Sequence, residues 1–222
     1  MTMASPVAPR RGFPWHVLVM AKSPIPGRVK TRLCPPMSPD EAARVAEAAL
    51  ADTLEAVARC GVARRIVALD GPPGEWIPPG FRVIAQRGAS FDRRLAAAWF
   101  DAAGPGLQSG MDTPQVSAEL LDHCLEAAGR PGATASLGPA PDGGWWSIAL
   151  AQRWDVDVFT GVPMSTPRTL VAQRSRLEAC GHRVRDLPEL RDVDSIEDAT
   201  AVAALIPGSR FARALTAETL AC

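Results

Sequence analysis

Short apolar runs rich in β-branched residues alternate with segments of helical periodicity along the whole sequence. This alternation is typical of βαβ units, in which helices connect the strands of one sheet and cover its faces. The sequence predicts strands at 15–21, 65–69, 81–85, 133–137, 145–150 and 182–187. Residues 106–112 stand where a further strand is needed, but their Gly, Gln and Ser content lowers the β propensity. We therefore expect a layered α/β fold.

The strongest local signal is a helix start at 38–41, with the sequence Ser-Pro-Asp-Glu. It combines an N-cap serine, a proline at the first helical position and a capping-box glutamate. Apolar residues then recur with a helical period up to Val57, and Gly61 ends the helix. Further helices are predicted at 91–102, at 117–128, from near 166 and from Ser195. The 222 residues suffice for one domain at 13–222, preceded by a disordered tail at 1–12.

The charge balance and the short apolar runs exclude several kinds of partner. The 24 basic and 24 acidic residues cancel to a formal net charge of zero, so the chain lacks the basic excess that favours nucleic acid or an anionic membrane. Apolar runs such as 17–21 are far shorter than the roughly 20 residues that span a bilayer. We expect a cytoplasmic protein with no nucleic-acid and no membrane partner. Five scattered cysteines without a C-x-x-C pair indicate neither a disulfide framework nor a zinc site.

A basic segment follows the first predicted strand. Both lysines of the chain, Lys22 and Lys30, lie in it together with Arg28 and Arg32. An extended backbone would point Arg28, Lys30 and Arg32 to one side, and a loop after the first strand of an α/β sheet is where such folds bind phosphorylated ligands. The segment therefore predicts a site for a diphosphate or triphosphate, with a solvated charged loop as the alternative. A Walker loop is excluded because Val29 stands where that motif has Gly.

Two acidic positions are candidate metal ligands. Asp112 follows the weak strand, which puts it at the carboxyl edge of the sheet. A carboxylate there can hold Mg²⁺ or Mn²⁺, which take one or two protein carboxylates and otherwise bind water and substrate phosphates; the alternative is a turn cap before Pro114. The densest acidic run, 192–198, offers Asp194 as the second ligand, whereas Asp198 is interpreted as a capping residue of the helix that follows.

A glycine-rich turn at 138–146 separates two predicted strands. Glycines let a backbone approach a ligand closely, and Asp142 could orient or deprotonate an acceptor while Trp145 and Trp146 line a pocket. The alternative is a structural hairpin, because Asp-Gly is a common turn pair and Trp a normal core residue. Spacing alone favours the hairpin. Ser-His-Asp chemistry is not indicated, because the sequence has no G-x-S-x-G elbow.

Five motifs occur in a characteristic order. They are Ala21-Lys22-Ser23-Pro24 through Gly27-Arg28-Val29-Lys30-Thr31-Arg32-Leu33, Gly110 to Pro114, Leu137-Gly138-Pro139 through Asp142-Gly143-Gly144, Pro163 through Ser165-Thr166, and Asp192-Val193-Asp194 through Glu197-Asp198. Together they resemble the small bacterial glycosyltransferase A-fold family of the arsenosugar-biosynthesis type, which is related to the guanylyltransferases of the deazaflavin-cofactor pathway. The resemblance extends over most of the chain. It implies a three-layer α/β/α nucleotide-diphosphosugar transferase fold with a mixed, mainly parallel sheet.

The resemblance also implies roles for individual residues. Lys22, Arg28 and Lys30 correspond to positions that bind nucleotide phosphates, and the alternating charge pattern adds Arg32. Asp112 and Asp194 correspond to ligands of Mg²⁺ or Mn²⁺. The catalytic set is Lys30, Asp112 and Asp142. The acceptor side comprises Asp142, Gly143, Gly144, Ser165 and Thr166.

These observations predict a metal-dependent transferase that uses a nucleotide-activated substrate. Glycosyl transfer from a nucleotide sugar to a small-molecule acceptor is the first interpretation. Nucleotidyl transfer, in which a nucleoside triphosphate joins a phosphorylated small molecule and pyrophosphate leaves, stays open because Asp112 is a single acid rather than half of a D-x-D pair. A third alternative is a nucleotide-binding module without turnover, which the departures from the family pattern at Gln108 to Met111 suggest.

Overall fold

The computed structural model describes residues 15–219, in which seven strands form one sheet in the order β3-β2-β1-β4-β6-β5-β7. The strands are β1 (His16–Lys22), β2 (Arg64–Asp70), β3 (Phe81–Ala85), β4 (Gly106–Gly110), β5 (Ala135–Pro139), β6 (Trp145–Leu150) and β7 (Val184–Asp186). Neighbouring strands are parallel except around β6, which is antiparallel to both β4 and β5. The expected mixed, mainly parallel sheet is confirmed. The tail predicted at 1–12 lies outside the described residues.

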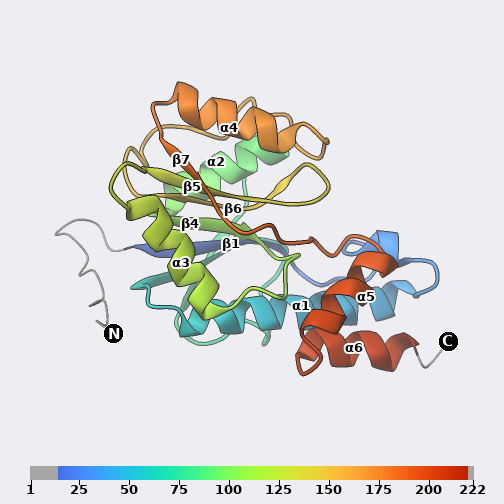
Figure 1. The fold of residues 1–222 in the computed structure, drawn as a ribbon. Coiled ribbons are helices and arrows are strands. Elements are labelled where there is room, and N and C mark those ends of the chain that lie inside the picture. The colour runs from blue at the N-terminus through green and yellow to red at the C-terminus, as the bar shows by residue number, and fades with distance from the viewer. Residues whose placement is uncertain (1–14, 220–222) are drawn as a thin grey trace, which may run out of the picture.

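Helices cover both faces of the sheet. Two of them, α1 (Pro39–Arg59) and α3 (Ala118–Gly129), lie on one side, and α2 (Phe91–Ala102) and α4 (Thr169–Ala179) lie on the other (Figure 1). Successive side chains of a strand point to opposite faces. In β1, Val17 and Val19 therefore belong to the apolar cluster under α1 and α3, whereas Leu18 belongs to the cluster under α2. The three-layer α/β/α architecture is confirmed.

The first helix begins as the sequence predicts. The Ser38 side chain accepts a hydrogen bond from the Glu41 N–H, and the Glu41 carboxylate accepts one from the Ser38 N–H at 2.6 Å, which completes the capping box. The buried face of α1 runs from Ala42 to Val57. The helix ends at the C-cap Cys60, one residue before the predicted stop at Gly61.

The strand with the weakest propensity, β4, lies at the centre of the sheet. It forms because β1 and β6 bond to it from both sides, so pairing outweighs the local preference of its residues. Gly106 is required there, because a Cβ at this position would lie 2.5 Å from the His16 carbonyl oxygen. Ser109, which is buried, donates from its hydroxyl to the Trp146 carbonyl at 3.1 Å.

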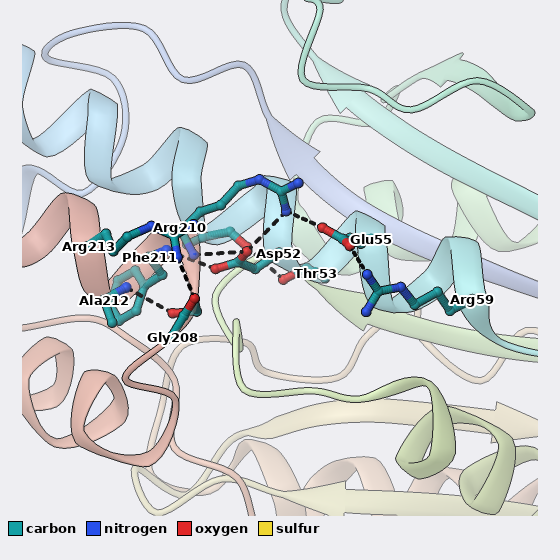
Figure 2. Close-up of polar contacts among 11 residues, drawn as sticks. Asp52, Thr53, Glu55, Arg59, Gly208, Arg210, Phe211, Ala212 and Arg213 are labelled. Carbon is teal, nitrogen blue, oxygen red and sulfur yellow. Dashed lines mark hydrogen bonds and ion pairs between the residues drawn. The ribbon is translucent and has the colours of Figure 1, made fainter.

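The C-terminal region contains two helices, α5 (Ile196–Leu205) and α6 (Arg210–Thr219), where the sequence predicted one. Both pack on α1 through a third apolar cluster that includes Val202 and Phe211 (Figure 1). Asp52 of α1 caps the start of α6, because its carboxylate accepts from the Phe211 N–H at 2.8 Å and the Arg210 N–H at 3.2 Å (Figure 2). Val193 of the acidic run belongs to the same apolar cluster, so the run also packs against α1.

Other differences from the sequence predictions are small. The helix expected from near 166 starts at Thr169, because the Thr166 N–H donates to the Thr169 hydroxyl in the turn before it. The last strand, β7, has 3 residues. The described cysteines are free thiols. Within residues 15–219, every helix is too short or too polar to cross a bilayer.

Candidate functional site

The carboxyl ends of β1, β2 and β4 meet at one edge of the sheet, because these three strands are parallel neighbours. The basic loop (22–38) leaves β1 at this edge, Asp70 ends β2, and Asp112 follows β4. The start of the loop is tied to β2, since the Ser23 N–H donates to the Asp70 carbonyl at 3.0 Å. The topology therefore brings the predicted phosphate and metal residues to one place.

The basic loop is folded rather than extended. Gly27 has a φ of 74°, Lys30 adopts a left-handed conformation with a φ of 46°, and a short 3₁₀ helix, η1 (Thr31–Leu33), follows. Alternate residues share one side only in an extended backbone. The prediction that Arg28, Lys30 and Arg32 point to one side is therefore wrong. Each of the three cations instead pairs with a different carboxylate.

Lys30 is the most enclosed cation of the basic loop. Its side chain is only 6% exposed, and the ammonium contacts both the Asp112 carboxylate and the Val193 carbonyl oxygen. Lys30 and Asp112 were both predicted site residues, and the structure brings them together as a direct ion pair. The pair joins the loop after β1 to the segment after β4 and to the acidic run.

The two arginines of the basic loop form more exposed pairs. Arg32 donates to the Asp194 carboxylate at 2.9 Å, with side chains 75% and 47% exposed. Arg28 lies 3.7 Å from Asp70, whose carboxylate also contacts Arg94 of α2 at 3.4 Å. Exposed ion pairs contribute little to stability because water and salt screen them. These guanidinium groups are therefore free to exchange their carboxylate for a ligand anion.

Lys22 is held through its backbone. Its N–H donates to the Met111 thioether at 3.1 Å, and the residue itself is exposed at the end of β1. Met111 is buried. This hydrogen bond connects the end of β1 to the segment after β4. Met111 therefore holds these two segments together beside the site.

The segment 187–191, which leads into the acidic run, follows β5 towards the site. The Leu187 and Leu190 N–H groups donate to the Leu137 and Pro139 carbonyls at 3.0 and 3.1 Å. The segment then crosses to β4, where the Val193 N–H donates to the carbonyl of Asp112 at 2.8 Å. Asp112 and the acidic run, which are far apart in the sequence, are neighbours for this reason.

Asp192 lies in the same cluster of acids, although only Asp194 of the acidic run was selected from the sequence. Burial raises the pKa of its carboxyl to about 7, and three neighbouring carboxylates add to the rise, namely Asp112, Asp142 and Asp194. The electrostatic influence of Asp142 on Asp192 indicates that the turn after β5 faces the same cluster. The alternation of Asp192 with Asp194 was visible in the sequence, but which of the two carboxyl groups is more enclosed follows only from the packing of the buried Val193 between them. The Asp198 side chain caps α5 with Ser195, as predicted.

The donor set fits a hard divalent cation that arrives with phosphate. Within residues 15–219, no three His, Cys, Asp or Glu side chains are arranged to hold an ion by themselves. Mg²⁺ and Mn²⁺ do not need such a cage, since they take one or two protein carboxylates and complete their shell with water and phosphate oxygens. Asp112 and Asp194, both partly exposed, could supply these two carboxylates.

The turn between β5 and β6 is a hairpin, as the spacing favoured. Its two strands are antiparallel, and the Asp142 carboxylate accepts from the Gly144 N–H at 2.7 Å. Gly143 has a φ of 85°, and a Cβ there would lie 2.3 Å from the Pro167 carbonyl oxygen. The turn is therefore packed tightly against the loop at 165–167. Trp146 is a core residue that donates to the Pro188 carbonyl at 3.0 Å, which agrees with the structural hairpin and not with the alternative that Trp146 lines a pocket.

The predicted acceptor residues of the fourth motif lie beside this turn. Thr166 is engaged locally, because its hydroxyl accepts from the Arg168 N–H at 3.2 Å. Ser165 lines a shallow hollow of about 480 Å³ between the start of α2 and the loop at 161–165. Phe91, which is 48% exposed, lines the same hollow.

A second hollow, of about 520 Å³, lies between α1, the start of α3 and α6. Its three arginines already have partners: Arg210 contacts Asp52 and Glu55, Glu55 also contacts Arg59, and Arg213 donates to the Gly208 carbonyl at 2.6 Å (Figure 2). This network docks α6 on α1. The residues predicted to bind nucleotide and metal do not line this hollow.

Solved structures show the class of fold to which the chain belongs. A Desulfovibrio desulfuricans protein, provisionally named a nucleotide-diphospho-sugar transferase, is 25% identical over 90% of this chain and 92% of that one, with a TM-score of 0.77. A Methanothermobacter nucleotidyl transferase is 20% identical over 91% and 99%, with a TM-score of 0.58. The Thermus thermophilus 2-C-methyl-D-erythritol 4-phosphate cytidylyltransferase is 19% identical over 86% and 98%, with a TM-score of 0.53. The fold is that of nucleotide-diphosphosugar transferases and nucleotidyltransferases, as the motifs implied.

The sequence also matches a family model. Residues 53–166 match the family described as "Uncharacterized protein conserved in bacteria (DUF2064)". The chain belongs to this family. A comparison with curated proteins found no significant match.

Proposed function

We propose that the protein is a metal-dependent transferase that moves a glycosyl group from a nucleotide sugar to a small-molecule acceptor. One observation carries the proposal: the basic loop after β1 and the acids after β4 and before α5 meet at the carboxyl edge of the sheet, as Lys30 with Asp112 and Arg32 with Asp194. Open α/β sheets bind their ligands at this edge. The fold shared with a provisionally named nucleotide-diphospho-sugar transferase supports the same class.

Each part of the site has a distinct task in this reaction. The acceptor oxygen bonds to the sugar carbon while the bond from that carbon to the nucleoside diphosphate breaks, and the acceptor proton leaves to a base. Lys22, Arg28, Lys30 and Arg32 would bind the phosphates and stabilise the charge that develops on the leaving diphosphate. A divalent ion held by Asp112 and Asp194 would supply further charge neutralisation there.

Asp142 is the proposed acceptor-side base. Its carboxylate orients the turn through the Gly144 N–H, and the turn packs on the loop that carries Ser165. The hollow of about 480 Å³ that Ser165 lines is the proposed acceptor pocket. Phe91 offers an apolar wall, so the pocket suits an acceptor with an apolar face beside its hydroxyl group.

Nucleotidyl transfer is the second candidate, and one observation favours it. Gly110 stands two residues before Asp112, so the segment after β4 offers a single acid instead of a D-x-D pair. In that reaction a substrate phosphate oxygen bonds to the α-phosphorus of a nucleoside triphosphate, and pyrophosphate leaves. The same cations and acids would serve both reactions.

One experiment separates the candidates. Purified protein with Mn²⁺ is incubated with a panel of nucleotide sugars and small hydroxyl-bearing acceptors and, separately, with nucleoside triphosphates and sugar phosphates. Release of a nucleoside diphosphate supports glycosyl transfer, and release of pyrophosphate supports nucleotidyl transfer. Asp112→Asn is the control, and it should lower either rate by at least tenfold. Nucleotide binding without any product would support the binding module and contradict the proposal.

A further inference from the structure

Both predicted metal ligands are paired with cations of the same loop. Lys30 contacts Asp112, and Arg32 contacts Asp194, although the two cations stand only two positions apart in the chain. The basic loop therefore supplies a counter-charge to each acid. Any divalent ion that binds these carboxylates must compete with the loop.

The Lys30 contact is the stronger competitor. The ammonium lies between a carboxylate oxygen of Asp112 and the carbonyl oxygen of Val193, and the side chain is 6% exposed. Carboxylate and carbonyl oxygens are also the donors that hard cations take in proteins. The lysine nitrogen thus occupies a cation position between two oxygen donors, shielded from the solvent that weakens surface pairs.

We propose that Lys30 is an internal counter-ion that is exchanged when substrate binds: the metal takes over Asp112, and the released ammonium binds a phosphate. The inference rests on the proposed function. Each ligand frees the partner that the other requires, so metal and phosphate assist each other's binding. Such coupling is reciprocal by thermodynamic necessity.

Arg32 and Asp194 provide an internal comparison. Their side chains are 75% and 47% exposed, so their pairing is screened and should oppose metal binding far less. The exchange is therefore assigned to Lys30, whereas Arg32 only adds to the positive charge of the loop. Arg28, which pairs with Asp70, also only adds positive charge, on the opposite side of the loop.

The first test measures Mn²⁺ alone, by paramagnetic resonance of the free ion. Lys30→Met should bind Mn²⁺ about tenfold more tightly than the wild type, which corresponds to about 1.4 kcal/mol. Lys30→Arg, which retains the charge, should stay near the wild type. Arg28→Met removes a charge from the same loop without touching Asp112, and it should change the Mn²⁺ affinity by less than threefold. Unchanged or weaker Mn²⁺ binding by folded Lys30→Met would overturn the proposal, as would equal gains in Lys30→Met and Arg28→Met.

The second test uses inorganic pyrophosphate in the presence of EDTA, measured by calorimetry. Asp112→Asn releases Lys30 and should bind pyrophosphate about tenfold more tightly than the wild type. Asp142→Asn removes a carboxylate from the same cluster without a Lys30 contact and should gain less than threefold. Equal gains in the two variants would show a general charge effect and overturn the exchange. This arm decides the question if circular dichroism shows that Lys30→Met does not fold.

Failure of this inference is distinguishable from failure of the proposed function. If the wild type forms product from a nucleotide substrate while the affinities above do not shift, the transferase stands and the exchange is wrong. If the affinities shift and no product forms from any nucleotide in the panel, the exchange stands and the transferase assignment is wrong.

Discussion

The backbone N–H of Val193 donates to the carbonyl oxygen of Asp112 at 2.8 Å, and this bond joins the acidic run to the segment after the central strand. Lys30 then contacts the remaining oxygens of the same two residues, the Val193 carbonyl and the Asp112 carboxylate. Three loops that are distant in the sequence therefore meet at the residue pair Asp112 and Val193. The positions of Asp112 and Asp194, the proposed metal ligands, therefore depend on the contacts that fix the acidic run.

Ser195→Ala should loosen the acidic run as well as destabilise the fold. Ser195 caps α5 by accepting from the Asp198 N–H at 3.2 Å, and loss of such a cap costs about 1 kcal/mol. Because Ser195, the N-cap of α5, directly follows Asp194, we also expect weaker Mn²⁺ binding. The control is Ser117→Ala, which removes the equivalent cap of α3, where Ser117 accepts from the Leu120 N–H at 3.2 Å. Equal Mn²⁺ affinities in two variants of matched stability would contradict this account of the acidic run.

Gly143→Ala should destabilise the turn that carries the proposed acceptor residues. The φ of 85° strains any alanine, and the added Cβ would meet the Pro167 carbonyl oxygen at 2.3 Å. Gly132→Ala is the matched control, because its φ of 86° is nearly the same but nothing lies within 4 Å of the added Cβ. Strain alone costs about 1–3 kcal/mol in either variant. In a urea unfolding titration, Gly143→Ala should therefore lose more free energy of unfolding than Gly132→Ala. A similar loss in both variants would show that the contact with Pro167 is unimportant.

Asp52→Ala should release α6 from α1. The Asp52 carboxylate accepts the Arg210 and Phe211 N–H groups and is 11% exposed (Figure 2). Hydrogen bonds to a charged group contribute about 1.5–3 kcal/mol, and limited proteolysis should cut first between α5 and α6. Glu47→Ala changes an exposed acid on the same helix and should leave the digestion pattern unchanged. An unaltered pattern for Asp52→Ala as well would show that apolar packing alone holds α6.

His16 should make the fold acid-sensitive. Burial, with a contribution from the Arg64 guanidinium, lowers the pKa of His16 to about 3, whereas an unfolded histidine titrates near pH 6.5. Between these values the unfolded chain binds a proton that the folded chain does not. Stability is therefore lost as the pH falls below about 6.5, by up to about 1.4 kcal/mol per pH unit.

His16→Gln should reduce this pH dependence, although the substitution also removes the ring contact with Trp99. Urea unfolding of both proteins at pH 7 and pH 5 gives the comparison. The wild type should lose more stability than the variant between the two pH values. Equal losses would show that other groups cause the acid sensitivity.

Much of the fold follows from local sequence signals. The capping box at Ser38 and Glu41 predicts the first residue of α1 correctly. The apolar runs predict the ends of most strands to within one or two residues of their positions in the structure. The central strand β4 could be placed only by its position between two other elements, because Gly106, Gln108 and Ser109 have little β propensity. The division of the C-terminal region into α5 and α6 depends on packing against α1, and periodicity does not reveal that contact.

The sequence indicated candidate residues for the site but not their geometry. The basic loop and Asp112 were identified because they follow strands of a parallel sheet. Their pairing could not be predicted, because the left-handed turn at Lys30 sends its side chain inward while Arg32 stays exposed. Asp192 was not selected for the same reason: burial depends on the path of 187–194 across the sheet edge.

Nucleotide binding by variants of the basic loop tests the central claim most directly. Calorimetric titration of a nucleoside diphosphate with Mn²⁺ should give a Kd at least tenfold weaker for Lys30→Ala than for the wild type. Arg174→Ala breaks an ion pair with Asp186 between α4 and β7 and should bind within about twofold of the wild type. If Lys30→Ala and Arg174→Ala bind the nucleotide equally well, the basic loop is not the phosphate site and the account is contradicted.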